Sequence, residues 1–185
     1  MKKVLLIIGI IFGVLILCAI LFVLVVLSTN LSKGNHKEVL QSKKLPLRKA
    51  FVVYQPSISD ISSRMAHQIA KGLNDGGYEV TLNNPGKHLS VDISTYQLVV
   101  FGSAAYYSQP SKALIDYMAS IKDYSSAKVA LYSTGIVPNN GDEYNAMKKA
   151  LNGIKPYEVL KFDANLKKEV NEKKAYEFGK ELSQK

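Results

Sequence analysis

Three short segments collect hydroxyl, tyrosine and glycine residues directly after apolar stretches of the chain. The first has hydroxyls at Ser57, Ser59 and Ser62 and leads into an apolar periodic stretch that begins at Ile61. The free N–H groups and the positive dipole end at the start of a helix bind phosphate, and nearby hydroxyls add donors. The segment therefore predicts a phosphate site, with simple helix capping by a serine or by Asp60 as the alternative.

The second and third segments have the residue types of a site for a planar ring. Tyr106 and Tyr107 follow the small residues Ser103 and Ala104, so their rings either stack on a ligand or pack as partly exposed aromatics. The third segment contains Thr134-Gly135 and then proline and asparagine. Its backbone amides suit the polar edge of a ring, and an ordinary Pro/Asn/Gly turn is the alternative.

Redox chemistry, if this chain carries it, must come from a cofactor. Cys18 is the only cysteine and lies within an apolar N-terminal stretch, so the rest of the chain has no thiol nucleophile, thiolate metal site or disulfide. The histidines are too scattered to predict a metal site, and Asp142-Glu143 opens a predicted helix, where acids complement the helix dipole. No catalytic residue is predicted.

The elements that position the three segments alternate between strand and helix. Short apolar runs predict strands at 50–54, 78–82, 97–102, 128–132 and 157–162. Apolar residues at helical spacing predict helices around 61–73, 114–121, 146–154 and 168–183. This alternation is typical of an α/β domain with a doubly wound, five-stranded parallel sheet. In such sheets ligands bind outside the carboxyl ends of the strands, which is where the three segments fall.

The three segments together resemble the flavodoxin family. In that family the first loop reads Ser/Thr-x-Thr-Gly-x-Thr, and here Ser57-Ile58-Ser59-Asp60-Ile61-Ser62 matches its hydroxyl positions. The second usually reads Gly-Ser-Pro-x-Tyr/Trp, close to Gly102-Ser103-Ala104-Ala105-Tyr106, and the third has Thr-Gly, as at Thr134-Gly135. Asp60 stands where the family has glycine, and Ala104 where it has proline. The resemblance covers about residues 49–185.

The resemblance implies strand order 2-1-3-4-5 and a site for flavin mononucleotide (FMN), with electron transfer to an unknown redox partner as the function. The first loop would hold the phosphate, Tyr106 or Tyr107 would stack on the isoalloxazine, and Thr134-Gly135 would face its edge. One alternative is a flavin-free binding or scaffolding module in which Asp60 has spoiled the phosphate loop. Another is a reductase that passes electrons from a nicotinamide donor to quinones, as some flavodoxin-fold enzymes do.

An uncharged, almost wholly aliphatic stretch from Val4 to Leu27 is long enough to cross a bilayer as one transmembrane helix. A cleaved signal peptide is the alternative, because Lys2 and Lys3 form a basic N-terminal region. The stretch is longer than a usual signal core, and its end lacks a small-x-small cleavage site. A lipoprotein is disfavoured because the residue before Cys18 is large.

The net charge of +9 comes from Lys2 and Lys3, from the linker region up to Lys49 and from the C-terminal tail, residues 161–185. Residues 51–160 carry nine basic and nine acidic groups, which argues against nucleic-acid binding. The basic residues of 29–47, with Arg48 and Lys49 after them, predict a linker that meets anionic lipid. Their excess over Lys2 and Lys3 favours a cytoplasmic domain. The chain is thus divided into an anchor (1–28), a linker (29–47) and a flavodoxin-like domain (48–185).

Overall fold

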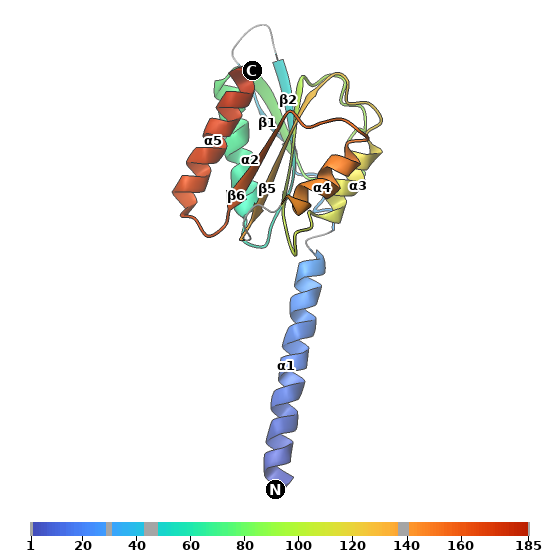
Figure 1. Cartoon of the computed structure of the whole chain (residues 1–185), viewed down its shortest axis with the longest axis vertical. Coiled ribbons are helices and arrows are strands. Elements are labelled where there is room, and N and C mark those ends of the chain that lie inside the picture. Colours follow the sequence, from blue (N-terminus) through green and yellow to red (C-terminus); the bar gives the residue numbers. More distant parts are fainter. Residues whose placement is uncertain (1, 29–30, 43–47, 137–140, 185) are drawn as a thin grey trace.

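The structure is a computed structural model that describes residues 2–28, 31–42, 48–136 and 141–184. One long helix, α1 (Lys2–Ser28), extends from an α/β domain in which a central sheet lies between two pairs of helices (Figure 1). The α/β class and the N-terminal apolar helix are both confirmed. The division at residues 28 and 47 stays a prediction.

The sheet has six strands in the order β1-β3-β2-β4-β5-β6. They are β1 (Glu38–Leu40), β2 (Arg48–Gln55), β3 (Tyr78–Asn83), β4 (Leu98–Ala104), β5 (Lys128–Gly135) and β6 (Glu158–Asp163). The five strands from β2 to β6 pair in parallel and follow the implied order 2-1-3-4-5. The doubly wound architecture is therefore confirmed, and all five parallel strands have their carboxyl ends at one edge.

The sixth strand corrects the predicted count of five. β1 lies inside the segment interpreted as a linker and pairs antiparallel with β3, with Val39 opposite Thr81. Asn74 donates from its side-chain amide to the backbone oxygen of Leu40 at 3.2 Å, which ties the new edge strand to a helix. Three residues are too few to produce a periodic pattern, so only pairing with β3 makes this segment a strand.

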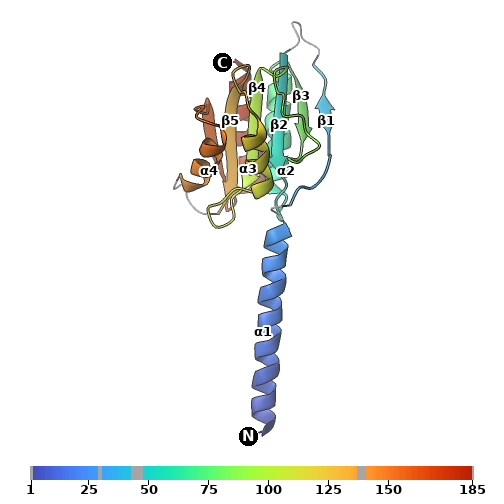
Figure 2. The ribbon, with the colours of Figure 1, turned by 90° about the vertical axis from the view of Figure 1, so that its right-hand side faces the viewer.

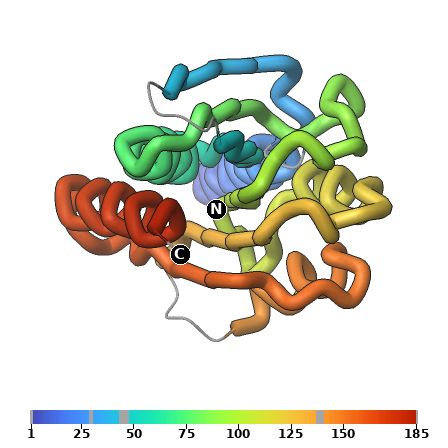
Figure 3. Tube along the Cα trace, turned by 90° about the horizontal axis from the view of Figure 1, so that it is seen from above, coloured from blue at the N-terminus to red at the C-terminus, as the bar shows by residue number. Residues whose placement is uncertain are grey.

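Helices α2 (Ile61–Asp75) and α5 (Lys168–Gln184) cover one face of the sheet, and α3 (Lys112–Ser120) and α4 (Asp142–Ala150) cover the other (Figure 3). Alternate residues of each strand enter the two resulting cores. In β2, Ala50 and Val52 pack toward α2 and α5, whereas Phe51 and Val53 pack toward α3 and α4. Burial on both faces explains why these strands are continuous apolar runs.

Helix α1 carries no buried residue and leaves the domain at the edge where the parallel strands end (Figures 1 and 2). It has 27 residues, and an 18-residue stretch within it has a mean hydropathy of 3.5, so α1 is long and apolar enough to cross a membrane. Contacts hold the chain after α1 against the same edge. Gln55 at the end of β2 donates from its amide to the backbone oxygen of Leu31 at 2.9 Å, and the hydroxyl of Ser32 donates to the backbone oxygen of Pro85 at 2.8 Å.

Candidate functional site

The three predicted loops meet at the carboxyl ends of β2, β4 and β5. The parallel register places Gln55 beside Ser103 and Ala104 beside Thr134, so the loops leave the sheet next to one another. A pocket of about 490 Å³ lies between them. Seven of the eleven predicted site residues line it: Ser59, Ile61, Ala104, Tyr106, Tyr107, Thr134 and Gly135. The remaining four are Ser57, Asp60, Ser62 and Ser103.

Asp60 adopts the left-handed backbone conformation, with φ 57° and ψ 3°. Its N–H donates to the backbone oxygen of Ser57 at 3.2 Å, which closes the turn that leads into α2. Glycine adopts this conformation freely, and aspartate is one of the few other residues that tolerate it. The loop therefore curls as a glycine loop would. The Asp60 carboxylate makes no capping hydrogen bond to α2, so the capping alternative does not explain it.

The three serine hydroxyls of the first loop differ from one another in their surroundings. Ser57 accepts a hydrogen bond from the N–H of Ser62 at 3.2 Å, so Ser57 caps the start of α2. Ser62 is fully buried, and its hydroxyl finds no hydrogen-bond partner among the described residues. Ser59 is exposed and lines the pocket. Of the three predicted phosphate-binding serines, only Ser59 lines the pocket.

The second loop is joined to the first through Tyr106. The N–H of Ile58 donates to the Tyr106 hydroxyl at 3.0 Å, which orients that ring over the pocket. Ser103 is buried, accepts from the N–H of Ser111 at 3.0 Å and donates to the backbone oxygen of Ala104 at 2.8 Å. Ser103 thus shapes the loop, and Tyr106 faces the pocket.

Tyr107 stands at the tip of a tight turn. Tyr106 and Gln109 exchange two backbone hydrogen bonds of 3.0 Å, and the two residues between them, Tyr107 and Ser108, have φ of 51° and 59°. Positive φ at both central positions defines a type I′ turn, which normally carries glycine or asparagine. Tyrosine in this conformation costs about 1–3 kcal/mol, a strain that is common at binding sites. The Tyr107 side chain is 82% exposed.

The third loop contributes a buried hydroxyl at the pocket wall. Thr134 is 1% exposed, and its Oγ1 makes no hydrogen bond within the described part of the chain, although Thr134 lines the pocket. An unsatisfied buried polar atom is costly and calls for an explanation such as a ligand. The rest of this predicted loop, 137–140, lies outside the described residues.

An ion pair that the sequence analysis did not predict closes one side of the pocket. Glu143, near the start of α4, contacts Lys161 of β6 at 2.5 Å and accepts a hydrogen bond from Ser133 of β5 at 2.6 Å. The two charged side chains are 2% and 9% exposed. The pattern around Glu143 indicated only an acid near a helix start, because nothing in the sequence pairs it with a lysine 18 residues later.

A buried tyrosine of the sheet contacts the first turn of α2. Tyr132 of β5 is fully buried and donates to the backbone oxygen of Ser62 at 2.9 Å. Burial raises the pKa of Tyr132 above its usual value, so its hydroxyl stays a donor. A Cβ at position 102 would overlap this ring, which explains why β4 has glycine there. Gly102 therefore leaves room for the Tyr132 ring, and the hydroxyl of that ring holds the start of α2.

The site has the size of a small-molecule pocket and is lined by aromatic rings and polar groups. About 490 Å³ falls within the range of small-molecule pockets, which runs from about 300 to 1,000 Å³. Two tyrosine rings, the unsatisfied Thr134 hydroxyl and the start of α2 surround it. The charged residues Lys161 and Glu143 line the pocket as an ion pair, and the Asp60 carboxylate lies at the first loop, just before α2.

Solved structures of other proteins have a similar fold. A flavodoxin from the domain Archaea has a TM-score of 0.55 and 16% identity, covering 74% of this chain and 96% of its own. A flavoprotein in complex with FMN from Lactobacillus acidophilus has a TM-score of 0.50 and 15% identity, and the match covers 62% of this chain and 92% of that protein. NAD(P)H:quinone oxidoreductase from Methanothermobacter marburgensis has a TM-score of 0.56 and 13% identity, and the match covers 74% of this chain and 99% of that protein.

These likenesses show that the fold is flavodoxin-like. No protein-family model matches the sequence, and a search of curated proteins finds no match.

Proposed function

We propose that the chain is a membrane-anchored flavodoxin-like protein that binds FMN and transfers electrons. The observation that carries this proposal is the pocket at the carboxyl ends of β2, β4 and β5, where the buried Thr134 hydroxyl lacks a partner within the described chain and two tyrosine rings face the same space. The flavodoxin-like fold supports it, because related folds hold FMN, as in the Lactobacillus flavoprotein.

The residues have distinct roles under this proposal. Ser59 and the N-terminal end of α2 hold the phosphate, Tyr106 and Tyr107 flank the ring, and Thr134 hydrogen-bonds its polar edge. When bound, FMN supplies the electron chemistry, while the protein sets its orientation and electrostatic surroundings. The ion pair of Lys161 and Glu143 keeps that side of the pocket close to neutral.

The direct test is the visible spectrum of the full-length protein purified in detergent. We expect a flavin spectrum as isolated, or one that develops when FMN is added and excess ligand is removed. Released cofactor identified as FMN by mass would complete the assignment. A protein that is colourless and that also fails to retain added FMN would contradict the proposal.

A flavin-free binding or scaffolding module is the second candidate, and Asp60 is the observation that favours it. The Asp60 carboxylate is exposed beside the loop that would wrap a phosphate, where it repels a phosphate dianion. The pocket would then bind an uncharged or cationic group of a membrane partner. FMN titration of Asp60 variants, described below, separates the two candidates.

For localisation, we propose that α1 spans the membrane once and that the domain lies on the cytoplasmic side. The length and hydropathy of α1 support the span. The lysines that follow α1 outnumber Lys2 and Lys3 before it, which supports this orientation.

A further inference from the structure

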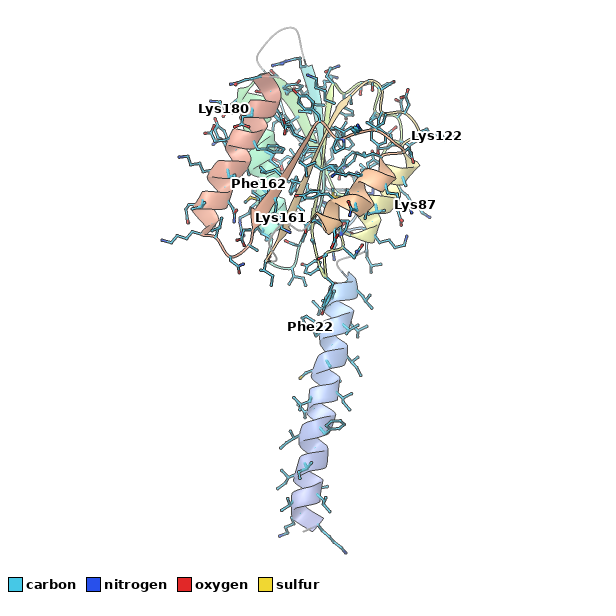
Figure 4. All side chains as sticks on the ribbon, in the orientation of Figure 1. Phe22, Lys87, Lys122, Lys161, Phe162 and Lys180 are labelled. Carbon is cyan, nitrogen blue, oxygen red and sulfur yellow. The ribbon has the colours of Figure 1, made fainter. Side chains whose placement is uncertain are left out.

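The pocket and the proposed membrane anchor are parts of one surface. Phe22 and Val26 of α1 line the pocket together with Tyr106 and Tyr107 of the second loop. Figure 4 shows Phe22 on the part of α1 nearest the domain. Only residues 29 and 30 separate α1 from Leu31, whose backbone oxygen is held by the side chain of Gln55. The strand-end edge of the sheet is therefore held close to the end of α1.

Exposed apolar side chains gather at this edge. Each of the five parallel strands is followed by a segment that carries one large exposed hydrophobic residue: Ile58 after β2, Val91 after β3, Tyr107 after β4, Ile136 after β5 and Leu166 after β6. Single exposed apolar residues are ordinary on protein surfaces, but a group of them on one edge marks an interaction site. Their position beside a long apolar helix points to lipid as the partner.

The length of α1 places this edge at the membrane surface. A hydrocarbon core of about 30 Å takes about 20 helical residues, which the stretch from Val4 to Val23 supplies. Phe22 then lies where the hydrocarbon ends, and the last turn of α1 lies among the head groups. Because Phe22 also lines the pocket, the loops opposite it reach the same depth.

We propose that the strand-end edge of the domain is itself a membrane-contact surface. In this arrangement Ile58, Tyr107, Ile136 and Leu166 lie in the lipid interface, and the pocket opens at the boundary between lipid and water. Tyrosine is well suited to this depth, because its ring is apolar and its hydroxyl reaches the head groups. The inference rests on the proposed membrane span of α1.

Charge supports the same contact. Lys167 directly follows Leu166, and Lys33 donates to the backbone oxygen of Ser28 at the end of α1 at 3.0 Å. Both ammonium groups lie where anionic head groups would meet the edge, and each basic residue near an anionic surface adds about 1 kcal/mol.

Single tryptophans test the contact, because the chain has none. Tyr107→Trp places the reporter at the strand-end edge, and Tyr157→Trp is the matched control at the opposite edge, just before β6. Phe12→Trp reports the middle of α1. Each full-length variant is reconstituted into phosphatidylcholine vesicles with a minor fraction of phosphatidylglycerol. Fluorescence is compared with and without phosphatidylcholine brominated near the head-group end of its acyl chains.

We expect bromolipid to quench the tryptophan at 107 several-fold more strongly than the one at 157. Ile136→Trp should be quenched as strongly as Tyr107→Trp. It replaces Tyr107→Trp as the reporter of the strand-end edge if the turn at 107 does not fold with tryptophan. Quenching at 107 and 136 no stronger than at 157, with deeply brominated lipid still quenching Phe12→Trp, would overturn this inference and leave the anchor standing. Absence of quenching at position 12 would overturn both.

Discussion

At the residue scale, Asp60 decides whether the first loop accepts a phosphate. Its backbone has the left-handed conformation that a glycine loop needs, so the geometry of the loop is retained. Its charge is the remaining obstacle, because a carboxylate about 4 Å from a phosphate costs about 1 kcal/mol per unit charge even in water. Backbone and side chain thus act in opposite directions at the same position.

Replacing Asp60 by glycine should strengthen FMN binding by roughly tenfold, since it removes about 1–2 kcal/mol of repulsion. Asp60→Asn is the matched control, because asparagine tolerates the same backbone conformation and lacks the charge. Fluorescence titration of FMN with each full-length protein in detergent gives the three affinities. If the Asp60→Asn and Asp60→Gly variants both bind no better than the parent, charge is not the obstacle. A parent without measurable binding beside a tight-binding glycine variant would support the flavin-free candidate.

At the scale of elements, a buried charge network joins α4, β5 and β6. Glu143, Lys161 and Ser133 come from these three elements and meet at one side of the pocket. The Tyr144 hydroxyl lies 3.0 Å from Ser133 Oγ, and burial raises the pKa of Tyr144 above its usual value. Such pairs are weak sources of stability as a whole, but loss of one partner leaves an uncompensated buried charge.

Lys161→Met should therefore destabilise the protein by about 3–5 kcal/mol, because it leaves the Glu143 carboxylate buried without its counter-ion. The double variant Glu143→Gln with Lys161→Met should recover most of this loss. Urea unfolding of both proteins and the parent measures the difference. Lys168→Met, at a lysine that is 58% exposed, is the control and should change stability by less than about 0.5 kcal/mol. A double variant as unstable as the single one would contradict the role assigned to the pair.

At the scale of the whole molecule, the two cores enclose several tyrosines. Burial raises the pKa of Tyr117, Tyr124, Tyr132 and Tyr144 above the ordinary value near 10. The folded state thus holds these protons more tightly than the unfolded state does. The stabilisation that this difference provides is fully present below the pKa of the unfolded tyrosines, and it is lost as the pH rises from there through the pKa of the folded ones.

We expect the urea midpoint of the full-length protein to stay level up to about pH 9 and to fall steeply above about pH 10. Tyr124→Phe should reduce this alkaline slope by about one proton, since it removes one buried titrating group. Tyr157→Phe, at an exposed position, is the matched control for loss of a tyrosine hydroxyl. Equal slopes for the parent and Tyr124→Phe would contradict this account.

At the same scale, we expect α1 to anchor the protein in the membrane. About 20 or more apolar residues make insertion strongly favourable, so full-length protein should stay with membranes through high-salt and carbonate washes. A chain beginning at Leu31 should fold, because β1 and the contacts of Ser32 and Gln55 are retained, and high salt should release it from anionic vesicles. Full-length protein in the salt wash, or a mature chain that begins near Ser28, would identify the N-terminal stretch as a signal peptide.

The sequence by itself determined the elements of this protein. Strands buried on both faces are continuous apolar runs, and helices that cover a sheet show apolar residues every three or four positions. These are local patterns, so the five parallel strands, three helices of the domain and the long apolar helix were predicted close to their observed positions. The helix predicted around 146–154 begins and ends four residues earlier, at Asp142 and Ala150. The order of the parallel strands came from the family resemblance.

Only the tertiary structure decided what lies beside what. β1 is too short to show a pattern and exists because β3 offers an unpaired edge. Lys161 meets Glu143 because Lys161 of β6 lies beside Ser133 of β5, which donates to the Glu143 carboxylate, and Ser62 is buried because it lies on the face of α2 that packs against the sheet. The pocket adjoins α1 because β2, β4 and β5 all end at the edge where that helix leaves the domain. Local periodicity records burial along one element, whereas a site depends on contacts between elements far apart in the chain.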